Sequence, residues 1–473
     1  MEIVVLAAGR GKRMRSSRAK VLHEIAGQPL LAHVLQTARE LNPAQVHVVV
    51  GRDGKEVASR CADGSDLNWI EQTEQLGTGH ATSQAIPHVD DNATVLVVYG
   101  DVPLADGQTL AQCAAASAEG GCIAVVTADA ADPAGLGRVL RNDDDSVAAI
   151  VEDADASDAE RRVTEINTGI LAAPAVALKR LLAGLGSDNT QGEFYLTDIV
   201  AAAQSEGVPV MGIKAPSFED YAGVNDRVQL AAAERRFQQR RAEALMREGV
   251  TFRDPARFDL RGTLKAGPDC TIDVNSVFEG EVVLGERVSI GPNCFIRDAV
   301  LGDDVSVEAN TVIDGARIER SSMIGPFARL RPGTQLGEGV KIGNFVETKK
   351  ARLGAGTKAS HLAYLGDAEV GDDCNIGAGA ITCNYDGVDK HETSIGDRVF
   401  VGTNATLVAP VEIGDDAYVG AGSTITVPVE EKDLAVGRSR QRNIKKWRSP
   451  QDRKKREGSR PNEEREGKPL ADE

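Results

Sequence analysis

The first half of the chain alternates short apolar runs with amphipathic segments. The apolar runs are rich in Val, Ile and Leu, and they lie at Ile3–Leu6, Val46–Val50, Val95–Val98, Ile123–Thr127 and Gly169–Leu171. Helical patterns separate several of them, for example Pro29–Leu41, which ends before Asn42-Pro43. Nearly continuous aliphatic strands joined by helices are typical of a parallel sheet covered on both faces. We therefore predict an α/β, Rossmann-like domain over residues 1–225.

One long helical pattern follows this domain. It begins at Asp226 and continues without interruption to Glu248, and Gly249 would end it as a C-cap. We predict that residues 226–249 form a helix that links two domains.

From about Val250 the pattern changes to an internal repeat of six residues. One aliphatic set is Ile318, Ile324, Leu330, Leu336 and Ile342, and another is Ile395, Val401, Leu407, Ile413, Val419 and Ile425. Each hexad would form one flat side of a triangular coil of ~18 residues, and coils would stack at ~4.8 Å. We predict a parallel β-helix over residues 250–433. The alternative, an ordinary antiparallel β domain, would show a period of two.

Two segments depart from the six-residue repeat. Thr382–Thr393 interrupts it, and loops that leave a regular solenoid tend to carry binding residues. Residues 434–473 contain many charges of both signs and few apolar side chains, so we expect this segment to be disordered at its end.

The composition excludes several classes of protein. The formal charge of −17 argues against a nucleic-acid partner, because sequence-independent binding needs a basic surface. No run approaches the ~18 apolar residues of a membrane span, and the first apolar run precedes its basic residues, unlike a signal peptide. We therefore expect a cytoplasmic protein. The seven scattered cysteines contain no C-x-x-C pair, so they indicate neither a disulfide framework nor a structural zinc site.

The first predicted strand leads directly into a glycine-rich turn, Leu6-Ala7-Ala8-Gly9-Arg10-Gly11-Lys12-Arg13-Met14. Such a turn lets backbone N–H groups approach phosphates closely. It lacks the third glycine of the dinucleotide fingerprint, and it does not match the P-loop pattern. The cations Arg13 and Lys20 suit a triphosphate, although a plain basic turn remains the alternative.

Asp101 follows the apolar run Val95–Val98, within Tyr99-Gly100-Asp101. It should therefore emerge at the carboxyl end of a strand, the edge where open α/β sheets bind ligands. A carboxylate there is a suitable hard-oxygen ligand for Mg²⁺. A turn or helix cap is the alternative role for an aspartate at a strand end.

Several motifs together resemble the sugar-nucleotide pyrophosphorylases: LAAGRGKRM, Lys20, QLGTGHA, YGDVPL, INTGI, QGEFYLTD and GVND. With the hexapeptide prism attached, the chain is similar to the bifunctional family that combines N-acetylglucosamine-1-phosphate uridylyltransferase and glucosamine-1-phosphate N-acetyltransferase. The similarity covers about Met1 to Arg448. It implies a left-handed β-helix, a homotrimer with acetyl-transfer sites shared between subunits, and synthesis of UDP-N-acetylglucosamine.

The resemblance also implies a first site, for UTP and N-acetylglucosamine 1-phosphate. Arg13 and Lys20 would be catalytic and hold the phosphates, and Asp101 and Asn225 would bind Mg²⁺. The nucleotide and its sugar product would contact Leu6, Ala7, Ala8, Gly9, Lys20, Gln72, Gly77, Thr78, Tyr99, Gly100, Asp101, Gly137, Glu152, Asn167 and Asn225. The attacking phosphate oxygen is already anionic, so positioning and charge neutralisation would suffice without a strong base.

The prism carries polar residues that its fold does not require. Arg331 and Lys349 should stack on neighbouring coils, because their spacing matches the ~18 residues of one coil. Two stacked cations would form a phosphate clamp, although a chance alignment of surface charges is the alternative. His361 follows this pair, and an imidazole with its ordinary pKa of about 6.5 suits proton removal from an amine. An isolated histidine is more often structural.

The resemblance assigns these residues to a second site, for glucosamine 1-phosphate and acetyl-CoA. His361 would be the catalytic base. The sugar phosphate would contact Arg331, Glu347, Lys349, Tyr364 and Asn375, and acetyl-CoA would contact Ala378, Asn384, Tyr385, Thr403, Ala421 and Arg438. The family commonly has Ser at the position of Thr403, and the threonine keeps the hydroxyl group. An acyl-enzyme on Cys383 is the alternative to direct attack by the amine.

Two other functions must be weighed against the bifunctional enzyme. The first is a single-function nucleotidyltransferase whose β-helix only assembles or regulates, and the cluster around Arg331, Lys349 and His361 argues against it. The second is a non-catalytic scaffold or sensor that retains nucleotide binding. It would not need the metal ligands Asp101 and Asn225.

Overall fold

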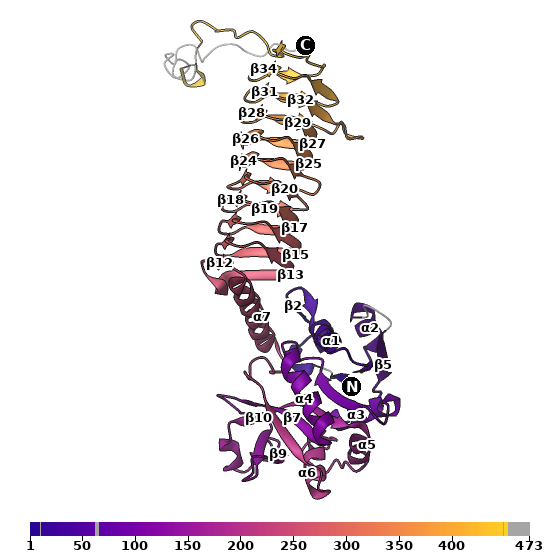
Figure 1. The fold of residues 1–473 in the computed structure, drawn as a ribbon. Helices are drawn as coiled ribbons and strands as arrows, with labels where there is room; N and C mark the ends of the chain where they lie inside the picture. The colour runs from indigo at the N-terminus through magenta and orange to yellow at the C-terminus, as the bar shows by residue number, and fades with distance from the viewer. Residues whose placement is uncertain (10, 62–65, 448, 453–473) are drawn as a thin grey trace, which may run out of the picture.

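The molecule consists of a compact head, a long helix and an elongated prism, in chain order (Figure 1). This computed structural model describes residues 1–9, 11–61, 66–447 and 449–452. The expected disorder at the end of residues 434–473 falls on residues 453–473, which lie outside the described residues. Among the described residues, no helix combines the length and apolar character that crossing a membrane requires.

Within the described residues, a nine-stranded sheet forms the centre of the head. Seven of its strands follow the order β11-β7-β10-β6-β1-β4-β5, and β8 and β9 extend from β10. Their bounds are β1 (Glu2–Ala7), β4 (Gln45–Val50), β5 (Leu67–Glu71), β6 (Thr94–Tyr99), β7 (Ile123–Asp129), β8 (Arg138–Arg141), β9 (Val147–Val151), β10 (Glu165–Pro174) and β11 (Val210–Lys214). A separate short hairpin pairs β2 (Glu24–Ile25) with β3 (Gln28–Pro29).

The sheet is mixed, so the prediction of a parallel sheet was wrong in part. β1 pairs in parallel with β4 and β6, and β7 pairs in parallel with β11. β10 instead runs antiparallel to both β6 and β7. After β7 the chain forms the antiparallel strands β8 and β9 and returns directly into β10. An antiparallel return needs no crossover helix, and the segment between β7 and β10 contains only the three-residue 3-10 helix Glu160–Arg162.

Helices cover both faces of the sheet. One core combines Ile3 and Val5 of β1 with α1, α2 and α4, and the other combines Val4 and Leu6 with α3, α5 and α6. Alternate residues of β1 therefore enter opposite cores, as the pleat of a strand requires. The helices are α1 (Leu30–Glu40), α2 (Gly54–Cys61), α3 (Thr78–Ala85), α4 (Gly107–Gly120), α5 (Ala175–Ala183), α6 (Asp198–Ser205) and α7 (Arg227–Arg247).

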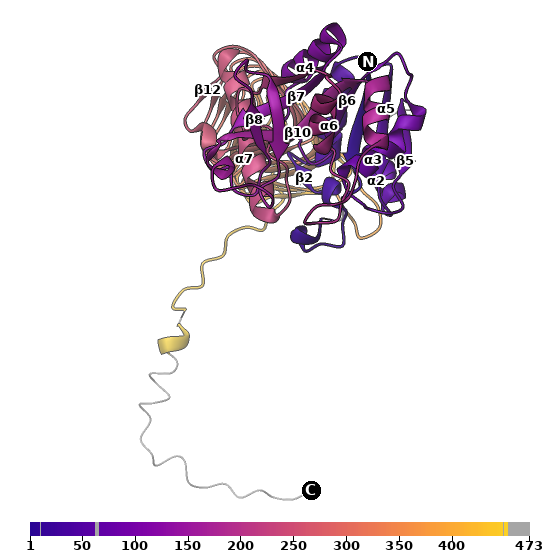
Figure 2. The same ribbon diagram turned by 90° about the horizontal axis from the view of Figure 1, so that it is seen from below.

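Helix α7 joins the head to the prism. Its N-cap, Asp226, accepts hydrogen bonds from the N–H groups of Val228 at 2.9 Å and Gln229 at 2.8 Å. Gly249 follows the helix with φ +101°, a conformation that favours glycine at a helix end. The early turns of α7 pack on the head, and its last turns pack into the first coils of the prism. Figure 2 shows the prism coils behind α7.

The prism is a parallel β-helix with three faces. The first face and the second face share one continuous sheet that bends along an edge. Five long strands run across both faces: β13 (Phe258–Ala266), β15 (Ser276–Leu284), β17 (Phe295–Leu301), β25 (Glu347–Leu353) and β27 (Tyr364–Val370). The first face comprises their N-terminal halves with β19 (Val312–Asp314), β22 (Arg329–Leu330), β29 (Ile381–Cys383), β32 (Thr406–Val408) and β35 (Thr424–Ile425), and the second face comprises their C-terminal halves with β20 (Arg317–Ile318), β23 (Gln335–Leu336), β30 (Thr393–Ile395) and β33 (Val411–Ile413). The third face contains β12 (Thr251–Phe252), β14 (Thr271–Ile272), β16 (Ser289–Ile290), β18 (Ser306–Val307), β21 (Met323–Ile324), β24 (Lys341–Asn344), β26 (Lys358–His361), β28 (Asn375–Ile376), β31 (Phe400–Val401), β34 (Tyr418–Val419) and β36 (Leu434–Ala435).

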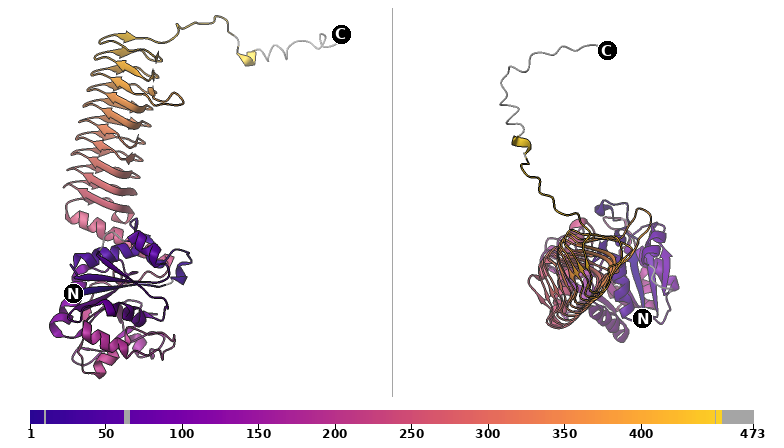
Figure 3. Two further views of the ribbon diagram at one scale, coloured as in Figure 1. Left: turned by 90° about the vertical axis from the view of Figure 1, so that its right-hand side faces the viewer. Right: turned by 90° about the horizontal axis from the view of Figure 1, so that it is seen from above.

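The strand pairings confirm the predicted coil. Thr271 pairs with Ser289, 18 residues later, and the coils superimpose when the prism is viewed along its length (Figure 3). The hexad aliphatics Ile318, Ile324 and Leu330 are buried in the axis, whereas Arg317 and Met323 beside them are exposed. This alternation explains the period: most of the two-residue strands bury one side chain in the axis, whereas β30 and β33 bury two.

Candidate functional site

The glycine-rich turn after β1 packs against Lys20. Gly11 has φ +58°, and a Cβ atom at this position would lie 2.7 Å from the Cβ of Lys20. Glycine therefore permits both the backbone conformation and the close approach of the turn. Arg13 lies in the short 3-10 helix Lys12–Met14 that follows. Arg10 of the motif lies outside the described residues.

An open cavity of about 680 Å³ lies over this turn, at the carboxyl edge of β1 and β6. Twelve of the residues predicted for the nucleotide site line it: Leu6, Ala7, Ala8, Gly9, Arg13, Lys20, Gln72, Gly77, Thr78, Tyr99, Asp101 and Asn225. Gly100 lies behind the lining, where its N–H donates to the carbonyl of Leu6 at 2.9 Å. The structure thus brings most of the predicted set together.

Lys20 stands between the two predicted metal ligands. Its Nζ bonds to Oδ2 of Asp101 and lies 3.1 Å from Oδ1 of Asn225. The side chains of Lys20 and Asp101 are each only 13% exposed. The N–H of Val224 donates to the carbonyl of Asp101 at 2.9 Å, which fixes the loop before α7 to the end of β6. A cation already occupies the point where the two oxygen donors converge.

The donors of Asp101 and Asn225 fit a magnesium ion. A carboxylate oxygen and an amide oxygen are hard ligands, and Mg²⁺ in phosphoryl-transfer sites takes few protein ligands beside substrate phosphates and water. Across the described ranges, no group of three or more His, Cys, Asp or Glu residues converges as a self-sufficient metal site. Any metal here would therefore need ligands from the substrate.

The three residues predicted to contact the sugar form a second cluster. The N–H of Asn167 donates to the carbonyl of Gly137 at 2.9 Å. Both carboxylate oxygens of Glu152 lie 3.4 Å from the point that a Cβ of Gly137 would occupy. Thr197 donates from Oγ1 to Oε1 of Glu152 at 3.1 Å. Burial raises the pKa of Glu152, because its ionised form loses water.

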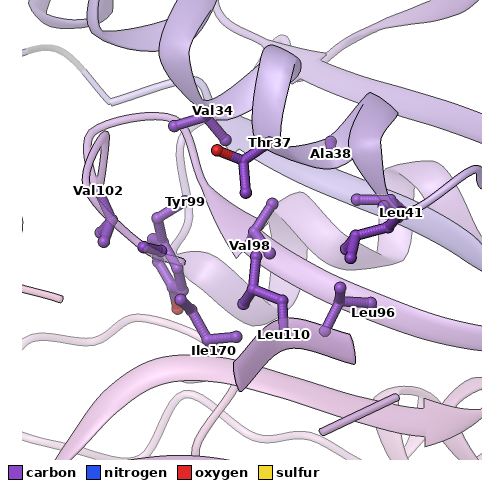
Figure 4. Close-up of a pocket in the computed structure, with 12 residues that line it drawn as sticks. Val34, Thr37, Ala38, Leu41, Leu96, Val98, Tyr99, Val102, Leu110 and Ile170 are labelled. Atoms are coloured by element: carbon purple, nitrogen blue, oxygen red, sulfur yellow. The ribbon is translucent and has the colours of Figure 1, made fainter. Parts of the chain in front are cut away.

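Tyr99 connects the two clusters of the head. Burial raises the pKa of its phenol, and the nearby carboxylates of Asp101 and Glu152 raise it further. Tyr99 also borders a small cavity of about 10 Å³ between α1, α4 and β6 (Figure 4). That cavity is lined almost wholly by apolar side chains such as Val34, Val98 and Leu110, so it belongs to the core and not to an anion site.

Sequence reasoning assigned no role to several residues that line or shape the large cavity. Gln75 donates from Nε2 to the carbonyl of Ala8 at 2.8 Å, and Glu193 forms part of the lining. Leu196 donates its N–H to Oγ1 of Thr78 at 3.1 Å. These residues belong to the quoted motifs QLGTGHA and QGEFYLTD, so the signal was present, but the chain separation hid their contact.

On the prism, His361 lies at the corner between the third face and the first face. Its Nδ1 is 2.6 Å from Oδ1 of Asn344, the residue paired with it one coil below. The strand registers place Ala378, Thr403 and Ala421 at the same corner on the next three coils. Arg438 then donates from Nη1 to the carbonyl of Ala421 at 2.8 Å. His361 and four of the predicted acetyl-CoA residues therefore form one continuous edge.

The first face carries the predicted cations. Arg331 donates from Nη1 to Oε1 of Glu347 at 3.0 Å, and Lys349 lies one coil above Arg331, as the spacing predicted. Nζ of Lys349 donates to Oδ2 of Asp367 at 3.1 Å. Tyr364 pairs with Glu347 on this face.

The loop 384–392 leaves the prism above this face, between β29 and β30 (Figure 3). It accounts for the longer spacing between Ile381 and its partner Thr406. Asn384 bonds through Nδ2 to Asp367, whereas Tyr385 is exposed and donates its hydroxyl to the carbonyl of Gly387 at 2.6 Å. Lys390 lies close to Lys349, and that neighbouring ammonium lowers the pKa of Lys390. Asn375 belongs to the third face, where it pairs with Lys358 on the strand that ends at His361.

Models of known families match four parts of the chain. Residues 3–192 match the model of the MobA-like NTP transferase domain. Residues 260–353 match the GMPPB C-terminal domain, residues 368–389 a hexapeptide repeat of succinyl-transferase, and residues 392–426 the bacterial transferase hexapeptide.

Full-length relatives decide the family. The chain is 55% identical over 460 residues to the "Bifunctional protein GlmU" of Alkalilimnicola ehrlichii, which covers 97% of this chain and 99% of that protein. Proteins of the same name from Idiomarina loihiensis and Marinobacter nauticus are 52% and 51% identical, over 96% and 95% of this chain and 99% of each relative. The chain belongs to the GlmU family.

Membership of the GlmU family confirms the predicted class of enzyme. The chain is a bifunctional transferase, with a nucleotidyltransferase domain followed by hexapeptide repeats. The alternative of a single-function nucleotidyltransferase is not favoured, because the relatives named as bifunctional match both halves. Two solved structures, a putative glucose-1-phosphate thymidylyltransferase from Bacillus anthracis and a UDP-glucose pyrophosphorylase, are 18% and 15% identical and each cover 49% of this chain, with TM-scores of 0.41. The matched regions cover 93% and 97% of those two solved chains.

Proposed function

We propose that this GlmU-family enzyme makes UDP-N-acetylglucosamine in two steps at two separate sites. The prism transfers an acetyl group from acetyl-CoA to glucosamine 1-phosphate. The head then transfers a uridylyl group from UTP to N-acetylglucosamine 1-phosphate and releases pyrophosphate. The observation that carries the proposal is that each half holds polar contacts that its fold does not require: Lys20 with Asp101 and Asn225 in the head, and His361 with Asn344 and Lys349 with Asp367 on the prism.

In the head, the cavity over the glycine-rich turn receives the nucleotide. The backbone of Leu6–Gly9, with Gln72, Gly77 and Thr78, surrounds the base and ribose, and Arg13 and Lys20 bind the phosphates. Gly137, Glu152 and Asn167 bind the sugar, where the buried carboxylate of Glu152 accepts a hydroxyl hydrogen bond. Asp101 and Asn225 hold Mg²⁺, which when bound neutralises charge on the phosphates.

Lys20 changes partner when the triphosphate enters. Its ammonium bonds to Asp101 and Asn225, and the phosphate oxygens offer it a stronger anionic partner. The phosphate oxygen of N-acetylglucosamine 1-phosphate attacks the α-phosphorus of UTP, and pyrophosphate leaves. The attacking group is already an anion, so Arg13 and Lys20 act by positioning and charge stabilisation.

On the prism, His361 is the general base. Because Oδ1 of Asn344 accepts from Nδ1, the lone pair of the neutral ring lies on Nε2. Nε2 removes the proton as the amine of glucosamine 1-phosphate attacks the thioester carbonyl, and coenzyme A leaves. Arg331 and Lys349 bind the sugar phosphate, and Glu347, Tyr364 and Asn375 position the sugar. Ala378, Asn384, Tyr385, Thr403, Ala421 and Arg438 bind acetyl-CoA.

Direct transfer is favoured over an acyl-enzyme on Cys383. Nucleophilic cysteines act as thiolates, usually activated by an adjacent imidazole. The two prism histidines have other partners: His361 contacts Asn344 and His391 contacts Asp386 at 2.8 Å. Neither of these hydrogen bonds involves the thiol of Cys383, so the contacts of the two histidines give no support for its activation.

A homotrimer would complete the acetyl-transfer site. Phe327, Phe345 and Leu362 project from one corner of the prism on successive coils, 50%, 56% and 60% exposed, and Leu362 directly follows His361. All three have positive φ, which is costly for large side chains, and the same corner carries asparagine in the coils below. Large apolar side chains at such positions indicate that another subunit covers them.

The division of the chain follows the two activities. We propose a uridylyltransferase domain over residues 1–225, the linker helix over 226–249 and the acetyltransferase prism over 250–433, with a C-terminal segment over 434–473. The proposal is supported by α7, which packs its first turns on the head and its last turns on the prism.

One experiment tests both reactions. The purified chain is incubated with glucosamine 1-phosphate, acetyl-CoA, UTP and Mg²⁺, and each component is omitted in turn. We expect UDP-N-acetylglucosamine only from the complete mixture, and N-acetylglucosamine 1-phosphate to accumulate when UTP or Mg²⁺ is left out. Formation of the nucleotide sugar without acetyl-CoA, or no acetylation in any mixture, would contradict the proposal.

A further inference from the structure

Two residues assigned to different substrates share one carboxylate. Nζ of Lys349 reaches Oδ2 of Asp367 from the coil below, at 3.1 Å, and Nδ2 of Asn384 bonds to the same oxygen from the coil above. Lys349 is assigned to the sugar phosphate and Asn384 to acetyl-CoA. Asp367 itself was not among the predicted site residues, and its side chain is only 17% exposed.

Two lysine ammonium groups lie near Asp367 and require a negative charge at its carboxyl group. Lys390 lies beside Lys349, and the carboxylate of Asp367 offsets their mutual repulsion. Partial burial of Asp367 opposes its ionisation, but the hydrogen bonds from Asn384 and Lys349 outweigh it and lower the pKa of the carboxyl group. Asp367 is therefore ionised at neutral pH, and without it two adjacent ammonium groups would repel each other.

The backbone explains how Asp367 can be changed without strain. Its φ of +45° is left-handed, a conformation that aspartate and asparagine tolerate better than most residues. Asp416, higher on the prism, also has a positive φ of +57° and holds Arg398 through two hydrogen bonds of 2.8 and 3.1 Å. Asp416 is thus a matched control: the same residue type, backbone conformation and kind of partner, outside both proposed sites.

We propose that Asp367 is a positioning residue that couples the binding of glucosamine 1-phosphate to the binding of the coenzyme, an inference that rests on the proposed acetyl-transfer function. When the sugar phosphate binds Lys349, the ammonium turns from Asp367 toward the phosphate. Oδ2 is then left to Asn384 alone, which strengthens that hydrogen bond and fixes the amide in the orientation that the coenzyme requires. By linkage, the coenzyme strengthens sugar-phosphate binding by the same factor.

Titration calorimetry with the unreactive pair coenzyme A and glucosamine 1-phosphate measures this coupling on the full-length protein. We expect saturating glucosamine 1-phosphate to tighten coenzyme A binding about fivefold in the wild type. In Asp367→Asn the ratio should fall to about one, while Asp416→Asn should keep the wild-type ratio. Coupling that survives in Asp367→Asn, or is lost equally in Asp416→Asn, would overturn the inference.

A second variant covers the case in which Asp367→Asn fails to fold, which circular dichroism and the uridylyl-transfer rate of the head would reveal. Asn384→Ala leaves the Asp367–Lys349 pair in place, so it should abolish coupling and keep glucosamine 1-phosphate affinity within about twofold of wild type. Retained coupling in Asn384→Ala would overturn the inference. If the wild type binds both ligands independently, only this inference fails, whereas failure to bind either ligand refutes the proposed function itself.

Discussion

His361 and Asn344 lie one coil apart on the prism, with Nδ1 of the imidazole 2.6 Å from the amide oxygen. An amide oxygen only accepts hydrogen bonds, so Nδ1 carries the hydrogen and Nε2 is the basic nitrogen. The contact also fixes the orientation of a ring that is otherwise exposed. In the proposed acetyl transfer, Asn344 would therefore act through His361 and prepare it for proton removal.

Removing the amide should slow acetyl transfer without weakening substrate binding. We expect Asn344→Ala to lower kcat for acetyl transfer about tenfold, the usual order for a lost hydrogen bond to an orienting partner, and to leave both KM values within about twofold. Asn344→Asp keeps an acceptor and adds a charge that favours imidazolium, so the pH of half-maximal rate should rise. Steady-state kinetics from pH 5.5 to 9 would measure both effects. A change in KM alone would show that the contact does not orient the base.

The two active sites should fail independently. His361→Ala removes the proposed base and should lower acetyl transfer by about 10²–10⁴-fold, with uridylyl transfer near the wild-type rate. Asp101→Ala removes a proposed metal ligand and the partner of Lys20, so it should abolish uridylyl transfer and leave acetylation intact. Separate assays of the two half-reactions on each variant provide the measurement, and each variant is the control for the other. Equal loss of both activities in a folded variant would contradict the two-site arrangement.

The sequence predicted best the elements in which apolar residues recur at a regular interval. Ile318, Ile324 and Leu330 recur every six residues because each short strand buries one side chain in the axis of the prism. The linker helix was predicted because a polar helical pattern ends at Gly249. The antiparallel direction of β10 was not predicted, because an aliphatic strand buried on both faces shows the same pattern in either direction.

The spacing of about one coil, which predicted that Arg331 and Lys349 stack, also separates the partners in two contacts that were not predicted. Lys349 and Asp367 are 18 residues apart, and Asn344 and His361 are 17 apart. Paired residues of neighbouring coils are 18 apart in some coils, as Met323 and Lys341, and 17 apart in others, as Lys341 and Lys358, without a sequence signal for the difference. A one-residue error therefore moves a side chain to the opposite side of the strand. The contacts of the head, such as that between Thr197 and Glu152, join residues that are far apart in the sequence. The ligand roles of all these residues remain predictions.

We expect the ionised carboxylate of Glu152 to lower the stability of the folded head, although the same group serves sugar binding. Burial raises its pKa in the folded protein, so the stability associated with the protonated form is present at low pH and is lost as the pH rises through the folded value. Glu152→Gln avoids this cost and should raise the unfolding temperature of the head by about 2 °C at pH 7.5. The difference should disappear as the pH falls below the ordinary value of 4.5.

Calorimetric scans at pH 7.5 and pH 4 measure the stability effect of Glu152→Gln, and the prism transition of the same sample is the control. The same variant should raise the KM for N-acetylglucosamine 1-phosphate about tenfold, because a neutral amide is a weaker acceptor for a sugar hydroxyl. A stability difference that persists at pH 4 would mean that the effect does not arise from ionisation of Glu152.

Phe345 should be needed for oligomerisation and not for the fold of a single prism. Its ring stacks on Phe327 at 5.4 Å, both rings are largely exposed, and its φ of +56° favours asparagine over phenylalanine. We expect Phe345→Asn to convert a trimer into monomers in sedimentation velocity runs, with no loss of circular dichroism. Asn310→Asp, at the same corner below Phe327, is the control and should remain trimeric. A trimeric Phe345→Asn variant would place the interface elsewhere.

The position at which the chain is cut within α7 should decide the stability of an isolated head. Leu230, Ala233 and Phe237 of α7 cover Ile25 and Leu104, and Arg236 forms two hydrogen bonds with Asp220, at 2.9 and 3.3 Å. A chain that ends at Arg227 loses these contacts, whereas one that ends at Arg241 keeps them.

Since burying each large apolar side chain contributes about 1.5–3 kcal/mol, the longer fragment should unfold at least about 5 °C higher. Thermal unfolding followed by circular dichroism compares the two fragments. Both should lack acetyl transfer, and the longer one should keep the uridylyl-transfer rate of the intact enzyme at 37 °C. Equal unfolding temperatures would show that the early turns of α7 do not belong to the head, and that the domain ends before the helix begins.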